Sequence, residues 1–194
     1  MAHTDIAAPP QRKLEIVPRK SLPVVAVVVI GLIVAIATNS LWAIGFYHVV
    51  GGGMWTAIDL FLGFILGPIL GTMSIPSRIE LTRRLMPKMV ILMPTLVIMT
   101  LAGGFQLARH QGFILSSDKH HAWVVASMII VGALAIVAIG ILEPANIAVL
   151  FELRKPNPNG ERIGRLMKRF LYTAGVTGIL QAGILVIMTR IATL

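Results

Sequence analysis

Long apolar runs recur along the whole chain and leave only short polar stretches between them. A run of about 20 apolar residues is enough to cross the hydrocarbon core of a bilayer as an α-helix. The runs cover residues 22–38, 41–72, 89–108, 122–142 with an extension to 153 past Pro144, and about 170–194. The pattern predicts an all-α, polytopic membrane helix bundle with about five transmembrane helices over residues 22–194, preceded by a polar N-terminal extension, residues 1–21.

The polar stretches between the runs carry most of the basic residues. Residues 75–88 read IPSRIELTRRLMPK, an amphipathic basic segment that we expect to lie at the membrane surface. Lys and Arg residues are retained on the cytoplasmic side of a bilayer. Residues 1–21 hold four of them, 75–88 four and 154–169 six, against none in 39–41 and two in 109–121. This alternation predicts a cytoplasmic N-terminus and a C-terminus outside.

Composition supports a membrane protein and excludes several other classes. Hydrophobic residues make up 56% of the 194 residues and charged residues 13%, whereas ordinary soluble domains carry about 25% charged residues. The formal net charge of +9 follows from the basic loops, so we predict no nucleic-acid partner. Cysteine is absent, which excludes disulfides, thiolate metal sites and haem attached through cysteine.

Four of the five histidines fall at the outer side of the predicted bundle. His48 lies near the outer end of the second run, His110 follows the third, and the pair His120 and His121 precedes the fourth; His3 is in the tail. Imidazole is a common protein ligand of haem iron, copper and zinc, so these four side chains form a candidate metal or haem site. The alternative is that the three loop histidines are ordinary polar loop residues.

The stretch HVVGGGMWTAID places His48, Gly52, Trp55 and Asp59 on one stripe of a helix. A glycine one turn after a histidine lets a haem macrocycle approach the backbone, so these residues are candidate cofactor ligands and contacts. Whether His48 is a ligand or a structural histidine stays open. Further along, Gly63, Gly67 and Gly71 have the spacing of helix-packing glycines.

Asp59 falls near the centre of the bilayer, where an ionised side chain costs about 2.5 to 3.5 kcal/mol. We expect it to be protonated or paired with Gln181 or Thr177 of the last run, or to belong to a proton or ion path with Gln181. His48 and Asp59 are separated by about 16 Å of helix rise and cannot share one metal ion. Near Glu143, Pro144 predicts a kink, and a quinone or ion site there competes with an ordinary polar helix end.

Around His48 the sequence resembles the CopD-like superfamily of small bacterial integral membrane proteins, typified by copper-resistance protein D. His48, Trp55 and Pro68 reproduce the family's spacing over about twenty residues, although Ala57 stands where the family usually has glycine. The resemblance implies a membrane bundle in the inner membrane of a prokaryote, with a functional outer histidine that binds haem b or copper.

Three functions therefore remain open from the sequence. The first is an accessory membrane subunit of a larger respiratory or electron-transfer oxidoreductase complex, a cytochrome b-like anchor without catalysis of its own, with other subunits and a quinone as partners. The second is a metal or small-solute transporter or channel with Asp59 and His48 along its path. The third is a purely structural membrane subunit that binds no cofactor.

Overall fold

The computed structural model describes residues 15–194, and all regular secondary structure in that range is helical. Five helical spans are long and apolar enough to cross a membrane: Arg19–Ala37, Leu41–Thr72, Ile75–His110, His121–Leu153 and Gly160–Thr193. The predicted class, an all-α multi-pass membrane bundle, is confirmed. His3 and most of the predicted N-terminal extension lie outside the described residues.

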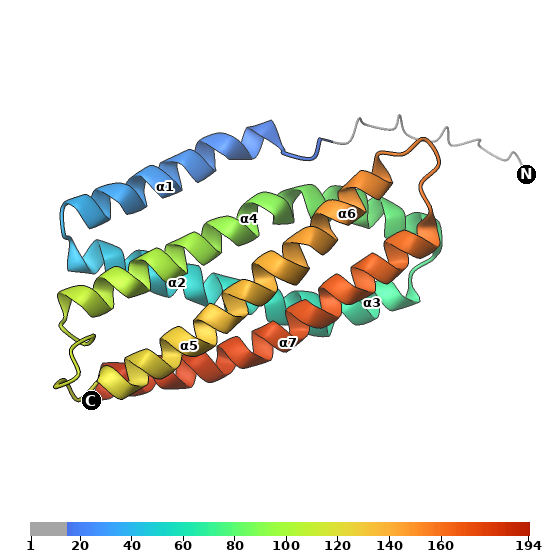
Figure 1. Cartoon of the computed structure of the whole chain (residues 1–194). Helices are drawn as coiled ribbons and strands as arrows, with labels where there is room; N and C mark the ends of the chain where they lie inside the picture. Colours follow the sequence, from blue (N-terminus) through green and yellow to red (C-terminus); the bar gives the residue numbers. More distant parts are fainter. Residues whose placement is uncertain (1–14) are drawn as a thin grey trace, which may run out of the picture.

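The five spans run antiparallel to their neighbours in sequence (Figure 1). The first is α1 (Leu22–Ala37), preceded by η1 (Arg19–Ser21), and the second joins α2 (Leu41–Leu60), the π-helix η2 (Phe61–Leu66) and α3 (Gly67–Thr72). The third is α4 (Ile75–His110), the fourth joins α5 (His121–Val137), the π-helix η3 (Ala138–Leu142) and α6 (Glu143–Leu153), and the fifth is α7 (Gly160–Thr193). The beginnings of α1, α4 and α7 share one end of the bundle, so the basic segments that predicted the orientation gather there.

The basic segment 75–88 is not a separate surface helix. It forms the first turns of α4, which is continuous over 36 residues. At 1.5 Å per residue α4 is about 54 Å long, whereas the hydrocarbon core of a bilayer is about 30 Å thick. Thr82 and Met86 of this segment are fully buried in the bundle. The polar turns therefore extend the bundle beyond the apolar zone, and the position of this segment at the membrane surface stays a prediction.

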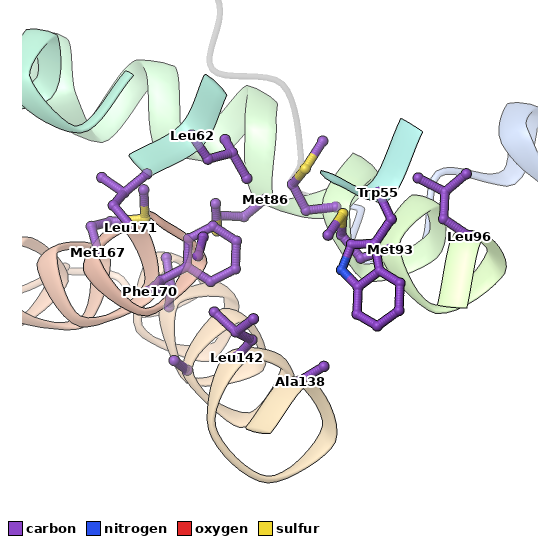
Figure 2. Close-up of a cluster of buried hydrophobic side chains, with 14 of the residues drawn as sticks. Trp55, Leu62, Met86, Met93, Leu96, Ala138, Leu142, Met167, Phe170 and Leu171 are labelled. Atoms are coloured by element: carbon purple, nitrogen blue, oxygen red, sulfur yellow. The ribbon is translucent and has the colours of Figure 1, made fainter. Parts of the chain in front are cut away.

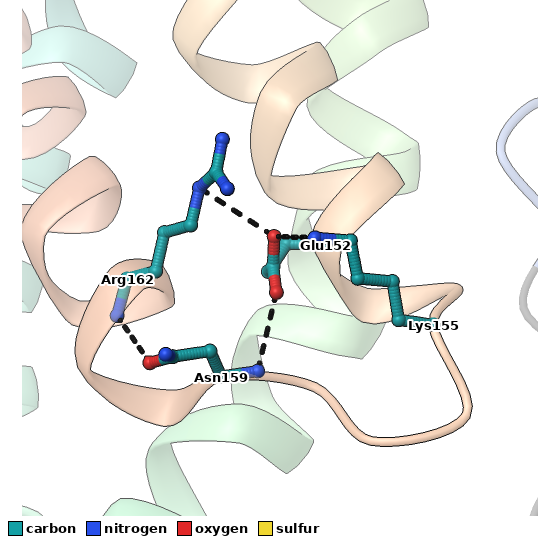
Figure 3. A network of polar contacts seen from close by, with 4 residues as sticks. All are labelled: Glu152, Lys155, Asn159 and Arg162. Carbon is teal, nitrogen blue, oxygen red and sulfur yellow. Dashed lines mark hydrogen bonds and ion pairs between the residues drawn. The ribbon is translucent and has the colours of Figure 1, made fainter.

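A buried carboxylate fixes the turn between α6 and α7 at the same end (Figure 3). Glu152, 3% exposed, accepts a hydrogen bond from Lys155 Nζ at 2.7 Å and one from the backbone N–H of Asn159 at 3.2 Å. Arg162 Nε lies 3.5 Å from the same carboxylate. The Asn159 side chain in turn accepts from Arg162 N at 3.0 Å and caps α7. Two of the six basic residues of segment 154–169 thus hold a helix turn together.

Both π-helices end just before a proline. The N–H of Gly67, which precedes Pro68, bonds to Leu62 O, and the N–H of Glu143, which precedes Pro144, bonds to Ala138 O. A proline in a helix has no N–H, and its ring collides with the carbonyl four residues earlier. Widening the preceding turn to i→i+5 bonding relieves that collision without breaking the helix. The widened turn of η3 lies directly before Glu143 and Pro144, where the sequence predicts a kink.

Close contact between α7 and the second span rests on glycine. A Cβ on Gly63 would meet the Cα of Gly175, and a Cβ on Gly178 would lie 2.9 Å from Leu60 N. Backbones approach this closely only where side chains are absent. The predicted packing role is confirmed for Gly63 and for Gly67, which faces Leu171, but a Cβ on Gly71 would meet nothing within 4 Å.

The apolar core lies where α4 and α7 pack on the second and fourth spans. Its buried side chains include Leu62, Met86, Leu142, Met167 and Phe170, which come from four different spans (Figure 2). By contrast, α1 lies along one edge of the bundle and buries only Leu32 and Ala35 (Figure 1). Its remaining apolar surface is left for lipid.

Candidate functional site

Asp59 is a carboxylate enclosed by the bundle. It is the last residue but one of α2 and is 1% exposed. Its Oδ2 accepts hydrogen bonds from Thr177 Oγ1 at 3.0 Å and from Gln181 Nε2 at 2.9 Å. The predicted pairing of Asp59 with Thr177 and Gln181 is therefore confirmed. Whether the group belongs to a proton or ion path is a separate question.

The glycine contacts explain why these partners reach Asp59. Thr177 and Gln181 are four residues apart on α7, so they lie on one face of that helix. Gly175 and Gly178 lie on the same part of α7 and bring its backbone against the segment that follows Asp59. The short side chain of an aspartate can then bridge the two helices directly. The two hydrogen bonds to Asp59 therefore depend on the close approach of α2 and α7.

Several polar atoms around Asp59 lack a hydrogen-bond partner. Among the described residues none pairs with Asp59 Oδ1, Trp55 Nε1 or Gln181 Oε1, and all three atoms are buried. Buried polar groups in proteins are paired in the great majority of cases, and each exception calls for an explanation. At Asp59 one oxygen is held by α7, and the residue lines an internal space.

That space is a cavity of about 180 Å³ between α2, α4, the π-helix η3 and α7. It is lined by Trp55, Asp59, Met93, Pro94, Val97, Ile98, Ala138, Ile139, Leu142, Glu143 and Phe170. The view in Figure 2 shows Trp55 beside Met93, with Ala138 and Leu142 of the fourth span facing them. The cavity brings two carboxylic acids, Asp59 and Glu143, to one apolar space.

Glu143 is a residue for which the sequence left two interpretations open, a quinone or ion site and an ordinary polar helix end. It is half-buried, and no hydrogen bond or ion pair is formed by its carboxylate with any described residue. Asn146, three residues further on, is 1% exposed, and neither of its side-chain polar atoms has a partner within residues 15–194. Sequence reasoning favoured an ordinary polar helix end here. The widened turn of η3 directly before Glu143 orients it toward the cavity, and no simple helical spacing predicts that.

A larger groove of about 290 Å³ lies between α5 and α7. Its lining is apolar except for the hydroxyl-bearing residues Thr173 and Thr177. Thr177 also donates to Asp59, so this groove and the Asp59 cavity meet at one threonine. The buried acid therefore lies close to apolar surface on two sides.

His48 packs into the contact between α2 and α4. Its Nδ1 donates to the backbone carbonyl of Thr100 at 2.8 Å. A Cβ on Gly104 would lie 2.6 Å from the imidazole Cε1, so the ring lies directly on that glycine. A carbonyl partner for Nδ1 fixes the tautomer and leaves the Nε2 lone pair, the arrangement found in metal-bound histidines. The chemistry of His48 fits a ligand and equally fits a packed structural histidine.

The space next to Gly52 is filled by protein. The methyl group of Thr100 lies 3.4 Å from the position that a Cβ on Gly52 would take. Gly51 beside it meets Met99 and Thr100 still more closely. Gly52 therefore faces α4, and its role as a cofactor contact stays a prediction. Trp55, the other predicted cofactor contact on this stripe, lines the Asp59 cavity instead.

The loop histidines have different surroundings. His120 is buried, stacks on Phe113 with ring centroids 4.1 Å apart, and donates through Nδ1 to Asp118 at 2.6 Å. His121 has a buried Nδ1 without a partner in the described chain, and His110 is exposed. Within residues 15–194 no three His, Asp or Glu side chains are grouped as metal ligands. The four outer histidines thus do not form the predicted metal cluster, and His120 has a structural role in its loop.

Asp118 anchors this loop electrostatically. Besides the imidazole, the backbone N–H of His120 donates to Asp118 Oδ1 at 2.7 Å. These hydrogen bonds from His120 lower the pKa of the Asp118 carboxyl below its ordinary value of 3.8. The loop meets the end of the chain as well, since Lys119 Nζ donates to the carbonyl oxygen of Leu194. The loop 111–120 and the C-terminus therefore lie at the same end of the bundle, as the topology requires.

Fold and site together define a multi-pass membrane protein with a buried acidic cavity. The chain matches no protein-family model, no curated protein and no solved structure. The likeness to CopD-like proteins therefore rests on His48, Trp55 and Pro68 alone.

Proposed function

We propose that this chain is a membrane transporter in which Asp59 carries a proton or a cation across the bilayer. One observation supports the proposal above the others: an enclosed carboxylate that lines a cavity has one oxygen bonded to Thr177 and Gln181 and the other oxygen unpaired. Ionisable groups inside a membrane are costly and typically mark ion pathways or proton relays. Glu143 in the same cavity provides a second site along such a path.

In this proposal the protein lies in the inner membrane of a prokaryote, with its N-terminus in the cytoplasm. The basic residues at the beginnings of α4 and α7 support that orientation. The cavity lies between this basic end and the outer end that carries His48. A path through Asp59 would therefore need short openings toward both sides rather than a continuous pore.

Flux measurements on reconstituted vesicles test the proposal. Wild-type protein in liposomes with an entrapped pH-sensitive dye should dissipate an imposed proton gradient, and Asp59→Asn should reduce that rate at least tenfold, because an amide cannot exchange the proton. Glu161→Gln is the matched control, since Glu161 is exposed in the first turn of α7. Equal rates for wild type and Asp59→Asn, both above those of empty liposomes, would rule out a transport role for Asp59.

A second candidate function, a haem- or copper-bearing subunit of an electron-transfer complex with a quinone as further partner, is favoured by the hydrogen bond from His48 to Thr100. His48 would ligate the metal through Nε2, and a bound haem b would supply one-electron chemistry. The absorption spectrum of the purified protein separates the two functions. A Soret band that disappears in His48→Ala but persists in His110→Ala supports the redox subunit, and a colourless wild type contradicts a haem.

A further inference from the structure

The Asp59 cavity contains two acids and no base. Among its lining residues only Asp59 and Glu143 are ionisable, and neither carboxylate forms an ion pair with a Lys, Arg or His of residues 15–194. An ionised acid within the apolar zone is stabilised by a positive charge close to it. Each acid is therefore either protonated or balanced by a cation that is not part of the described chain.

The hydrogen-bond pattern indicates where this cation would bind. Asp59 Oδ2 is occupied by Thr177 and Gln181, which leaves Oδ1, buried and unpaired, as the oxygen available to a cation, on a residue that lines the cavity. One turn earlier, the indole of Trp55 forms part of the same wall, and Phe170 of α7 forms another part. Aromatic faces attract cations in addition to the attraction of a carboxylate.

The remaining lining is unsuitable for a bare metal ion. Apart from the two acids and the two aromatic residues it consists of Met93, Pro94 and aliphatic side chains. Hard cations such as Ca²⁺ take six to eight oxygen ligands, and Mg²⁺ requires nearly ideal octahedral coordination. Within the described chain no three His, Asp or Glu side chains converge at all. A cation whose charge is spread over alkyl groups matches two acids, two aromatic rings and apolar walls much better.

The cavity lies close to the outside of the bundle. Ile98 of α4 and Ile139 of η3 both line it and are 50% and 67% exposed. We therefore expect a cation with alkyl substituents to enter on this side, from the bilayer. Ordinary ligand pockets measure about 300 to 1,000 Å³, so a cavity of about 180 Å³ selects a compact molecule.

We propose that the cavity between Asp59 and Glu143 binds a compact organic ammonium ion, with Asp59 and Glu143 as counter-ions and Trp55 as a cation–π partner. The inference rests on the proposed transport function and names the transported ion. In one state of the transport cycle the carboxylates bind a proton, and in the other state they bind an alkylammonium ion. Binding and transport can nevertheless be measured separately.

Fluorescence of Trp55 reports binding directly. The chain has three tryptophans, and Trp42 and Trp123 are exposed, so the double variant Trp42→Phe, Trp123→Phe leaves Trp55 as the single tryptophan. Titration of this protein in detergent with tetraethylammonium should change its emission saturably. Tetrabutylammonium should be at least tenfold weaker because it exceeds the cavity, and the neutral analogue 3,3-diethylpentane should give no saturable change.

Charge variants in the same background complete the test. Glu143→Gln should weaken tetraethylammonium binding at least tenfold. This variant should fold like the wild type, because the Glu143 carboxylate forms no hydrogen bond in the described chain. Asp59→Asn should weaken binding further, while Glu161→Gln should leave it unchanged. Four results would each overturn the inference. They are unchanged affinity in Glu143→Gln, equal binding of the neutral analogue, displacement of the ammonium ion by micromolar Ca²⁺ or Mn²⁺, and the absence of a saturable signal.

The outcomes also separate this inference from the proposed function. Saturable, charge-dependent binding without any Asp59-dependent flux keeps the ammonium site and rejects the transporter. Proton flux that depends on Asp59 but no ammonium binding keeps the transporter and rejects this cargo.

Discussion

Gly63 and Gly175 meet backbone against backbone: a Cβ on Gly63 would lie 2.7 Å from Gly175 N. No side chain can occupy that space, so the two helices must separate if Gly63 becomes larger. Asp59, four residues earlier, would then be drawn away from Thr177 and Gln181. The glycine contact therefore controls both the stability of the bundle and the geometry of the buried acid.

Gly63→Ala should lower the free energy of unfolding by about 1 to 3 kcal/mol, the usual cost of overpacking a core. Thermal unfolding in detergent, followed by circular dichroism, measures the loss. Gly71→Ala is the matched control, because it belongs to the same G-x-x-x-G pattern yet a Cβ there meets nothing within 4 Å. A Gly63→Ala variant as stable as Gly71→Ala would contradict the close contact.

Thr177→Val should destabilise the Asp59 pair while preserving shape. Valine keeps the branched side chain of threonine but cannot donate to Asp59, which then retains only Gln181. Loss of one buried hydrogen bond to a polar group costs about 1 to 3 kcal/mol. Denaturation in mixed micelles measures the cost, and Thr189→Val, whose hydroxyl bonds only within its own helix, is the control. Additive effects in the double variant Asp59→Asn, Thr177→Val would show that the two side chains are not coupled.

Gly104→Ala should displace the imidazole of His48. A Cβ there would lie 2.6 Å from Cε1 and 2.7 Å from Nδ1, so the ring must rotate and lose its bond to Thr100. Nitrogen NMR of histidine-labelled protein distinguishes the two imidazole tautomers. The wild type should show a signal fixed in the Nδ1–H form, and the variant a mixture. Gly132→Ala, with open space at that position, should resemble the wild type.

The loop 111–120 should loosen in acid. The pKa of Asp118 is lower in the folded protein than its ordinary value of 3.8, because the folded state provides hydrogen bonds to the ionised form. Its stabilising contribution is complete above about that ordinary value and is lost as the pH falls through the lower, folded pKa. Amide exchange at His120 should therefore accelerate over that range, and Asp118→Ala, which has no side-chain acceptor, should exchange quickly at every pH. Exchange independent of pH in the wild type, after correction for intrinsic rates, would contradict the anchor.

Breaking the Glu152 network should destabilise the turn between α6 and α7. Glu152→Gln keeps the acceptor for Asn159 N but removes the charge that Lys155 and Arg162 share. Because these two cations are more than half exposed, we expect a modest loss of about 1 kcal/mol. Protease cleavage within residues 154–159 should accelerate in parallel. The exposed Glu161→Gln should show neither effect.

The sequence predicts those features of this protein that depend on local periodicity. The five spans follow from apolar runs, and the pairing of Asp59 with Thr177 and Gln181 follows because few polar side chains lie at membrane depth to serve as its partners. Glu143 could not be found in this way, since its direction depends on the widened turn of η3. The contact of Gly52 with Thr100 could not be predicted from the sequence either, because it depends on how α2 and α4 cross.

The two π-helices have a consequence for how this chain can change in evolution. Each contains one residue more than an α-helical turn would hold. The number of residues in η3 therefore sets the direction in which Glu143 points from its helix, and the number in η2 sets the direction of the residues after Phe61. The identity of the side chains within these turns has no such effect. Removing a single residue from η3 would rotate Glu143 by about 100° around its helix, away from Asp59. Homologous chains should therefore vary freely in the apolar residues of these turns and yet never differ there by an insertion or a deletion.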